Sequence, residues 1–285
     1  TQTTLRLIYC NPVANTGGIN MEQLELISHP DLGARIKSIE QNGYAYFPGA
    51  LTTGQISNLK KAMDKLTAIE ESFNRHSTPD NGGFLNKHIS NAFNRDPIFR
   101  QYLDHAGIIE LAEAVHGDDC HIIGMTAWVT GPGRPDQQLH CDWLPVELPE
   151  DVLSDPRVKM PVFITTAHYY LNDMYEELGP TKFIPGTHLS GRRPNGDTQW
   201  QGRSEKSVLC KAGDVVMFRS EVRHRGTSNR SEQDRYLLQV HYANRMITQK
   251  FPPYLNKFKF NPDLIANCTP RQLRLLGDHQ ASNYD

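Results

Sequence analysis

From Cys120 onwards the chain reads as a series of short β-rich runs, and this pattern limits the fold more than any other feature of the sequence. Gly- and Pro-containing turn signals such as Gly131-Pro132-Gly133 and Pro185-Gly186 separate the runs. Short strands with regular punctuation of this kind are typical of a β-sandwich or barrel. We therefore expect strands at 121–130, 136–141, 162–171, 181–184, 207–210, 214–218 and 235–244.

The part of the chain before Cys120 has helical rather than strand periodicity. Residues 34–41 predict a helix that ends at Asn42-Gly43, where glycine tolerates a left-handed cap. A second helix follows a Thr cap, because its apolar residues recur at helical spacing: Ile56, Leu59, Met63 and Leu66. Further helices are expected from Asp96-Pro97 and at 108–115, whereas 74–91 reads as a polar loop.

No Gly/Ser-rich or Pro-rich linker divides the 285 residues, so we expect one domain over 1–285. Within it we expect a mainly helical part at 1–118, the β-rich core at 119–250 and a C-terminal segment at 251–285. Thr269 as a cap, Pro270 in the first turn and Gly277 after the end predict a short helix in that segment.

Composition disfavours several classes of partner. A formal net charge of −2 gives no general attraction for nucleic acid or for an anionic membrane. No apolar run approaches the roughly 20 residues needed to cross a bilayer. Five cysteines without a CxxC pair favour a reducing compartment over a disulfide scaffold. We expect a soluble, cytoplasmic protein that acts on a small molecule, and an oligomer is compatible with the sequence.

His140 and Asp142 form the strongest chemical motif. In an extended strand, residues two apart point to the same side, so an imidazole and a carboxylate would meet at one point. His224 is the third ligand that we expect. Two histidines and one carboxylate form the facial triad of non-haem Fe(II) oxygenases, which leaves the opposite positions open. By contrast His29-Pro30-Asp31 has the same spacing within a polar turn, and we interpret it as the entry to a helix.

The order of several motifs resembles the phytanoyl-CoA dioxygenase family, from about Leu32 to about Gly277. The resemblance rests on Gln137 to Asp142, on residues 178–188 with the string Gly-Pro-Thr-Lys-Phe-Ile-Pro-Gly-Thr-His, on residues 213–218, on His224-Arg225-Gly226, on Asn229-Arg230-Ser231 and on Arg235. The chain is similar in particular to microbial members that tailor natural products. Leu178-Gly179 stands where the family usually has Asn-Gly, which is a departure at one turn.

This resemblance implies a mainly β fold with helical additions: a double-stranded β-helix, the cupin-like jelly roll, flanked by N-terminal helices. It implies an enzyme that uses Fe(II), 2-oxoglutarate and O2 and releases succinate and CO2. The expected reaction is hydroxylation, desaturation or epoxidation at a C–H bond of a small or medium apolar metabolite in secondary metabolism. Asp142 occupies the position that related halogenases leave open for halide, so halogenation is disfavoured.

The resemblance also implies roles for residues outside the triad. Arg235 would bind the far carboxylate of 2-oxoglutarate, since a guanidinium offers bidentate geometry, and Gln137 and Thr181 match polar positions that contact the co-substrate. Trp128 shares strand parity with Thr126, and both are candidates for substrate contact together with Phe84. Two long polar stretches, 144–160 and 189–206, follow site motifs directly, and we expect them to cover the substrate.

Other interpretations remain open at this point. His168 and His241 are the best alternative ligands, although a histidine within an apolar run is more often a satisfied core residue. His188 is expected to brace its loop. A metal-dependent hydrolase or isomerase on the same barrel would need neither Arg235 nor O2. A cupin-like binding protein without catalysis is the third interpretation.

Overall fold

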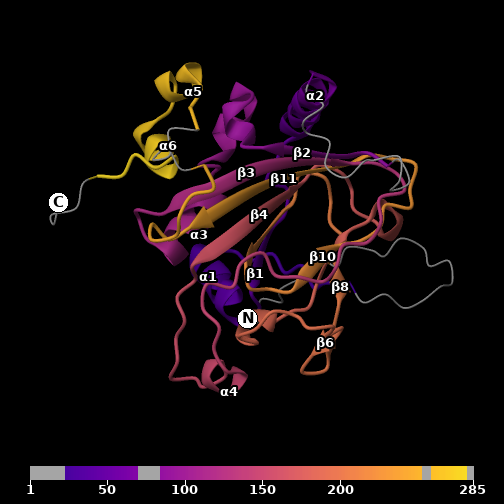
Figure 1. Cartoon of the computed structure of the whole chain (residues 1–285), viewed down its shortest axis with the longest axis vertical. Coiled ribbons are helices and arrows are strands. Elements are labelled where there is room, and N and C mark those ends of the chain that lie inside the picture. Colours follow the sequence, from indigo (N-terminus) through magenta and orange to yellow (C-terminus); the bar gives the residue numbers. More distant parts are fainter. Residues whose placement is uncertain (1–22, 70–83, 252–257, 281–285) are drawn as a thin grey trace, which may run out of the picture.

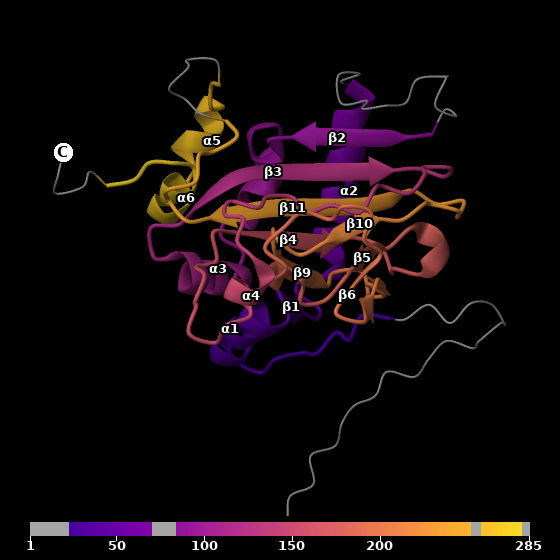
Figure 2. The same ribbon diagram turned by 60° about the horizontal axis from the view of Figure 1, so that its bottom comes forward.

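A six-stranded antiparallel sheet, the major sheet, dominates the computed structural model of the chain, which describes residues 23–69, 84–251 and 258–280. The strands lie side by side in the order β1–β9–β4–β11–β3–β2, and Figure 2 shows them one above the other, with β2 uppermost. Their bounds are Tyr44–Phe47 (β1), Asn86–Ser90 (β2), His121–Thr130 (β3), Ile164–Tyr170 (β4), Val215–Arg219 (β9) and Arg235–Ala243 (β11).

A smaller three-stranded sheet, the minor sheet, consists of β10 (His224–Gly226), β5 (Thr181–Phe183) and β8 (Lys206–Ser207). An apolar cluster containing Phe183, Val216, Phe218 and Leu237 joins residues of the minor and the major sheet. β6 (Gln199–Trp200) and β7 (Arg203–Ser204) form a separate hairpin. Two antiparallel sheets packed in this way form the expected jelly-roll core.

Helices cover the other face of the major sheet (Figures 1 and 2). They are α1 (Leu32–Gln41), α2 (Thr53–Ile69), α3 (Ile108–His116), α5 (Pro262–Ala266) and α6 (Pro270–Leu275), joined by the 3-10 turns η3 (Ala92–Asn94) and η4 (Pro97–Tyr102). Leu59 and Met63 of α2 are fully buried in the main apolar cluster with Val240 of β11. The spacing of these side chains explains the helix, because positions three or four apart share one face.

Strand alternation gives the major sheet two chemically different faces. Val129, Tyr169 and Leu238 belong to the apolar cluster under the helices. Their neighbours in sequence point the opposite way, because successive side chains of a strand alternate. Trp128, His168, Leu237 and Gln239 accordingly line a cavity between the sheets. The inner face of the jelly roll is therefore polar at its centre.

Three of the strand and loop expectations are wrong. Of the strand expected at 207–210, only Ser207 lies in β8. Residues 136–141 do not form a strand; His140 makes an isolated bridge to His224 instead, because Pro132 and Pro135 interrupt the backbone ahead of it. The expected loop at 74–91 includes β2, which pairs with the edge of β3. Residues 74–83 of that loop, like Cys10, lie outside the described residues.

The helix termini match the sequence signals. Asp31, which the sequence places at the entry to a helix, caps α1 by accepting a hydrogen bond from the Ala34 N–H at 2.8 Å. Thr269 caps α6 in a capping box with Gln272. Across 23–69, 84–251 and 258–280, no helix is long and apolar enough to span a membrane. Cys120, Cys141, Cys210 and Cys268 are free thiols.

Candidate metal centre and adjoining cavity

His140 and Asp142 lie on the irregular segment that follows β3, and His224 opens β10. The backbones of His140 and His224 pair directly: the N–H of His140 donates to the His224 carbonyl at 3.0 Å, and the reverse bond is 2.7 Å long. The N–H of Asp142 donates to the Ser220 carbonyl at 3.0 Å. These bonds keep the segment extended without a regular strand, so the two-residue spacing still places both side chains on one side.

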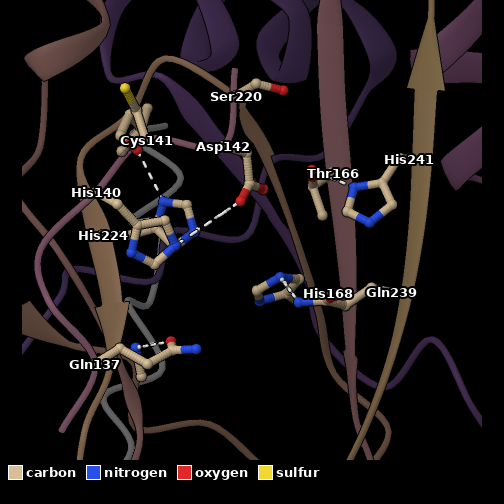
Figure 3. A network of polar contacts seen from close by, with 12 residues as sticks. Gln137, His140, Cys141, Asp142, Thr166, His168, Ser220, His224, Gln239 and His241 are labelled. Atoms are coloured by element: carbon tan, nitrogen blue, oxygen red, sulfur yellow. Dashed lines mark hydrogen bonds and ion pairs between the residues drawn. The ribbon is translucent and has the colours of Figure 1, made fainter. Parts of the chain in front are cut away.

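The three side chains converge on one point (Figure 3). Asp142 Oδ1 lies 3.8 Å from His140 Nε2 and 3.7 Å from His224 Nε2. All three ligand atoms are within 4.8 Å of one another, and among the described residues no other group of His, Cys, Asp or Glu side chains meets this criterion. Three donor atoms at this separation can share one metal ion while leaving the side that faces the cavity open.

Backbone carbonyls orient both imidazoles. Nδ1 of His140 is 2.8 Å from the Gln138 carbonyl, and Nδ1 of His224 is 2.9 Å from the Val222 carbonyl. Since a carbonyl only accepts, each Nδ1 carries the proton and each Nε2 keeps its lone pair for a metal. The tautomers follow from these partners.

The charge states complete a donor set that fits a divalent ion such as Fe(II). Burial opposes ionisation of Asp142, but nearby imidazoles, His224 foremost, outweigh it and hold the pKa of Asp142 below its ordinary value. Burial lowers the pKa of His224, so its imidazole is neutral at neutral pH. Two nitrogen ligands and one anionic oxygen ligand match the facial triad.

A cavity of about 100 Å³ adjoins the triad. Gln137, Thr181 and Arg235, the residues implied for co-substrate binding, all line it. Gln137 Oε1 accepts a hydrogen bond from the Gly226 N–H at 2.8 Å, which leaves the amide nitrogen as a donor. The Arg235 guanidinium is buried and donates to the Gly179 carbonyl, while its Nε has no partner. Donors without acceptors suit an anionic ligand, which 2-oxoglutarate is.

Three side chains on the inner face of the major sheet form a hydrogen-bonded relay. The Trp128 indole N–H, which can only donate, is 2.7 Å from Gln239 Oε1. The Gln239 amide nitrogen therefore faces His168 Nε2, at 2.8 Å. His168 Nε2 accepts, so the proton of the neutral ring is on Nδ1, which is buried without a partner. His168 thus has a donor without a partner, and it stands outside the ligand group.

The other side chains considered for the site lie elsewhere. His241 Nδ1 bonds Thr166 Oγ1 at 2.9 Å and is not part of the ligand group. Phe84 and Thr126, the further candidates for substrate contact, are buried but are not among the residues that line the cavity. His188 Nε2 donates to the Glu40 carbonyl at 2.9 Å, as expected for a residue that braces its loop.

The sequence did not point to several residues of the cavity, among them Arg134 and Gln239. Arg134 lines it although it lies in a polar turn, where an arginine is ordinarily a solvated charge. Gln239 orients His168, but in the sequence it is one polar residue in an apolar strand. The available signal for Gln239 was its parity with Arg235, since residues 235, 237 and 239 share a face.

A second, larger cavity of about 220 Å³ lies between the two long polar stretches. The stretch 144–160, which contains the short helix α4 (Glu150–Leu153), supplies most of its apolar wall, and Leu189 supplies another part. Its floor includes Arg219 and Glu221, whose side chains form a buried ion pair at 3.2 Å. The stretch 144–160 and Leu189 therefore enclose a cavity that is lined by none of the three candidate ligands.

The chain is similar to a known protein family and to two fungal dioxygenases. The model of the family described as Phytanoyl-CoA dioxygenase (PhyH) matches residues 39–237. Dioxygenase trt7 of Aspergillus terreus is 27% identical over 203 residues, which are 67% of this chain and 64% of that protein. Dioxygenase FUM3 of Gibberella moniliformis is 24% identical over 235 residues, 76% of this chain and 73% of that protein.

Solved structures share the fold at low sequence identity. The epimerase SnoN, solved with Fe3+, alpha ketoglutarate and nogalamycin RO, has a TM-score of 0.62 at 19% identity over 80% of this chain and 90% of its own. HygX from Streptomyces hygroscopicus, with nickel, 2-oxoglutarate and hygromycin B bound, has a TM-score of 0.59 at 14% identity over 80% and 95%. The family match spans more than half of the sequence and includes all three candidate ligands and Arg235, so the chain belongs to the phytanoyl-CoA dioxygenase family.

Proposed function

We propose that the chain is an Fe(II)- and 2-oxoglutarate-dependent dioxygenase that oxidises a C–H bond of a small or medium apolar metabolite. This proposal rests on one observation: the three candidate ligands and the buried guanidinium of Arg235 line the same cavity. A metal-dependent hydrolase would use the metal without needing an anion site beside it. Family membership supports the same reaction class.

His140, Asp142 and His224 would hold the iron, each through the atom that the structure leaves available. With iron, 2-oxoglutarate and O2 bound, such a centre couples oxidative decarboxylation of the co-substrate to succinate and CO2 with oxidation of a C–H bond. The protein's own contribution is positional: backbone carbonyls fix both imidazoles, and the Asp142 carboxylate supplies negative charge.

Arg235, Gln137 and Thr181 would hold the co-substrate. The guanidinium binds the far carboxylate, and the Gln137 amide nitrogen adds a neutral donor from the segment that carries His140. All three side chains line the same cavity as the triad, so one extended diacid could reach from metal to arginine. Thr181 and Arg235 are buried, which excludes water that would otherwise compete for their donors, whereas Gln137 is exposed.

Trp128 is the candidate that we retain for substrate contact, since it lines the cavity and His88 packs on it with ring centroids 4.1 Å apart. A natural-product substrate is supported by the structural relatives, which include SnoN from nogalamycin biosynthesis and HygX solved with hygromycin B bound. Buried free thiols support a reducing, cytoplasmic location.

The test is turnover of a panel of microbial metabolites by iron-loaded protein with 2-oxoglutarate and O2. We expect succinate and substrate loss to rise together, with the product gaining one oxygen atom or losing two hydrogen atoms. Asp142→Ala should abolish both signals. Substrate conversion without O2 consumption would establish the hydrolase or isomerase instead, and ligand retention without succinate would establish a binding protein.

A further inference from the structure

Two arginines, Arg134 and Arg235, lie buried in the metal cavity without an acidic partner. Arg134 is 6% exposed and Arg235 8% exposed, and both line the cavity. Neither guanidinium has a carboxylate within 4.0 Å among the described residues. Arg134 Nη1 donates to the carbonyls of Gly226 and Thr227, at 3.2 and 3.4 Å. Carbonyl dipoles orient this guanidinium, and Asp136 offsets only part of the desolvation that lowers the pKa of Arg134.

The acid beside Arg134 in sequence is already engaged. Asp136 binds Arg225 Nη1 at 2.6 Å and accepts from the Ser228 N–H at 2.7 Å. Arg225 in turn binds Glu205 at 2.6 Å. Arg225 of β10 thus has two acidic partners, whereas Arg134 and Arg235 have none within 4.0 Å among the described residues. This contrast indicates that Arg134 and Arg235 are not ordinary surface arginines that happen to be buried.

Both guanidiniums converge on the space above Gly226. A Cβ added at Gly226 would lie 3.1 Å from Arg134 Nη1, 3.6 Å from Arg235 Nη2 and 3.0 Å from Gln137 Oε1. Gly226 has no positive φ, so its backbone does not require glycine. The absent side chain instead leaves the two guanidiniums room to face a common ligand.

Two like charges in one buried cavity are costly unless an anion joins them. Burial lowers the pKa of Arg235 to about 10, and the charge of Arg134 adds to that effect. Burial also lowers the pKa of Arg134. Both groups stay protonated at neutral pH, and a carboxylate placed between them would relieve their repulsion.

We propose that Arg134 is a second anchor for the far carboxylate of 2-oxoglutarate, which it binds together with Arg235. This inference rests on the proposed function and names a residue that the family motifs do not include. One carboxylate has two oxygens, so each guanidinium can bind one of them. The pair also selects against 2-oxo acids with a single carboxylate, because these would leave two buried cations unpaired.

The test compares two ligands of equal chain length, 2-oxoglutarate and 2-oxopentanoate, which lacks the far carboxylate. Their dissociation constants are measured anaerobically on Fe(II)-loaded wild type and Arg134→Met, from the metal-to-ligand absorption band. We expect Arg134→Met to weaken 2-oxoglutarate binding by at least about 30-fold, as for truncation of a buried charge partner, and to leave 2-oxopentanoate binding unchanged. Arg230→Met, an exposed arginine of the same region, should change neither ligand.

Each other outcome overturns a defined part of the account. Equal weakening of both ligands would show that Arg134 only supports the fold, and no weakening would show that Arg235 suffices; both results overturn the inference. If neither ligand binds wild type in the presence of metal, the proposed function itself fails. Should Arg134→Met not fold, Arg134→Lys retains the charge, and we expect it to weaken 2-oxoglutarate selectively by a smaller factor, since the fork geometry is lost.

Discussion

His140 and His224 exchange backbone hydrogen bonds in both directions, and this pairing brings their imidazoles to within 4.5 Å, measured between ring centroids. The two residues are far apart in sequence, yet they oppose each other as partners in a single antiparallel bridge. The metal centre therefore depends on a contact between the irregular segment after β3 and the minor sheet. Phe218 supports it from the major sheet, with its ring centroid 4.9 Å from that of His224.

Gly226→Ala tests whether free space above β10 is required for the co-substrate. The new methyl group would lie close to Gln137 Oε1 and Arg134 Nη1, so it would occupy volume that the diacid needs. We expect the dissociation constant of 2-oxoglutarate to rise about 10-fold, which is about 1.4 kcal/mol, while metal still binds. Calorimetric titration of the Mn(II)-loaded protein measures both.

Gly124→Ala is the matched control for that substitution. It also lies in a strand, but its Cβ would meet only Lys250 and His241 at ordinary contact distances of 3.5 and 3.8 Å. We expect unchanged affinity for 2-oxoglutarate. An equal loss in both variants would mean that added bulk in the sheets, rather than the space at Gly226, controls binding.

Glu221→Gln should destabilise the fold by leaving the Arg219 guanidinium buried and uncompensated. Both side chains are 7% exposed, so solvent cannot replace the lost partner. The expected cost is about 3–5 kcal/mol in the free energy of unfolding, measured by urea denaturation. Replacing both residues, as Arg219→Met with Glu221→Leu, should recover most of it. Lys211→Met, which breaks an exposed pair, should cost less than about 1 kcal/mol.

Stability should fall as the pH drops from about 6.5 to about 4, and His116 contributes to this fall. Burial lowers the pKa of His116 to about 4, against 6.5 in the unfolded chain. Within that window the unfolded state binds a proton and the folded state does not, so acid favours unfolding. Two and a half pKa units correspond to about 3 kcal/mol.

The measurement is the free energy of unfolding of metal-free protein at several pH values. The Val162 carbonyl and Thr165 Oγ1 each lie 2.8 Å from a ring nitrogen of His116 and fix the ring in place, while burial holds it neutral. His116→Gln should lower stability at every pH but reduce the slope between pH 6.5 and 4 by about one proton. A slope equal to that of wild type would show that His116 does not carry this dependence.

The triad could be predicted because its signal is local and chemically specific. His140 and Asp142 are two residues apart, and that spacing places both on one side of any extended backbone, whether or not a strand forms. In place of the strand expected at 136–141, separate backbone hydrogen bonds to Gly226, His224 and Ser220 hold the segment extended. These bonds suffice to place His140 and Asp142 on one side. Capping signals such as Asp31 and Thr269 are local in the same sense.

Arg134 could not be predicted, because its environment arises only when three distant segments meet. The turn that carries it reads as polar surface, and its burial follows from contact with the carbonyls of Gly226 and Thr227. β2 was missed for a related reason. Asn86–Ser90 is polar, and pairing with β3, a tertiary contact, overrides that composition.

Anaerobic titration of the protein with Fe(II) in the presence of 2-oxoglutarate tests the central claim most directly. Wild type should bind one iron per chain and develop a metal-to-ligand absorption band, because three ligands and an open face are already in place. His140→Ala, Asp142→Ala and His224→Ala should each lose the bound iron and the band, while His188→Gln, remote from the triad, should keep both. Equal iron content and spectra in all five proteins would contradict the assignment of the metal centre.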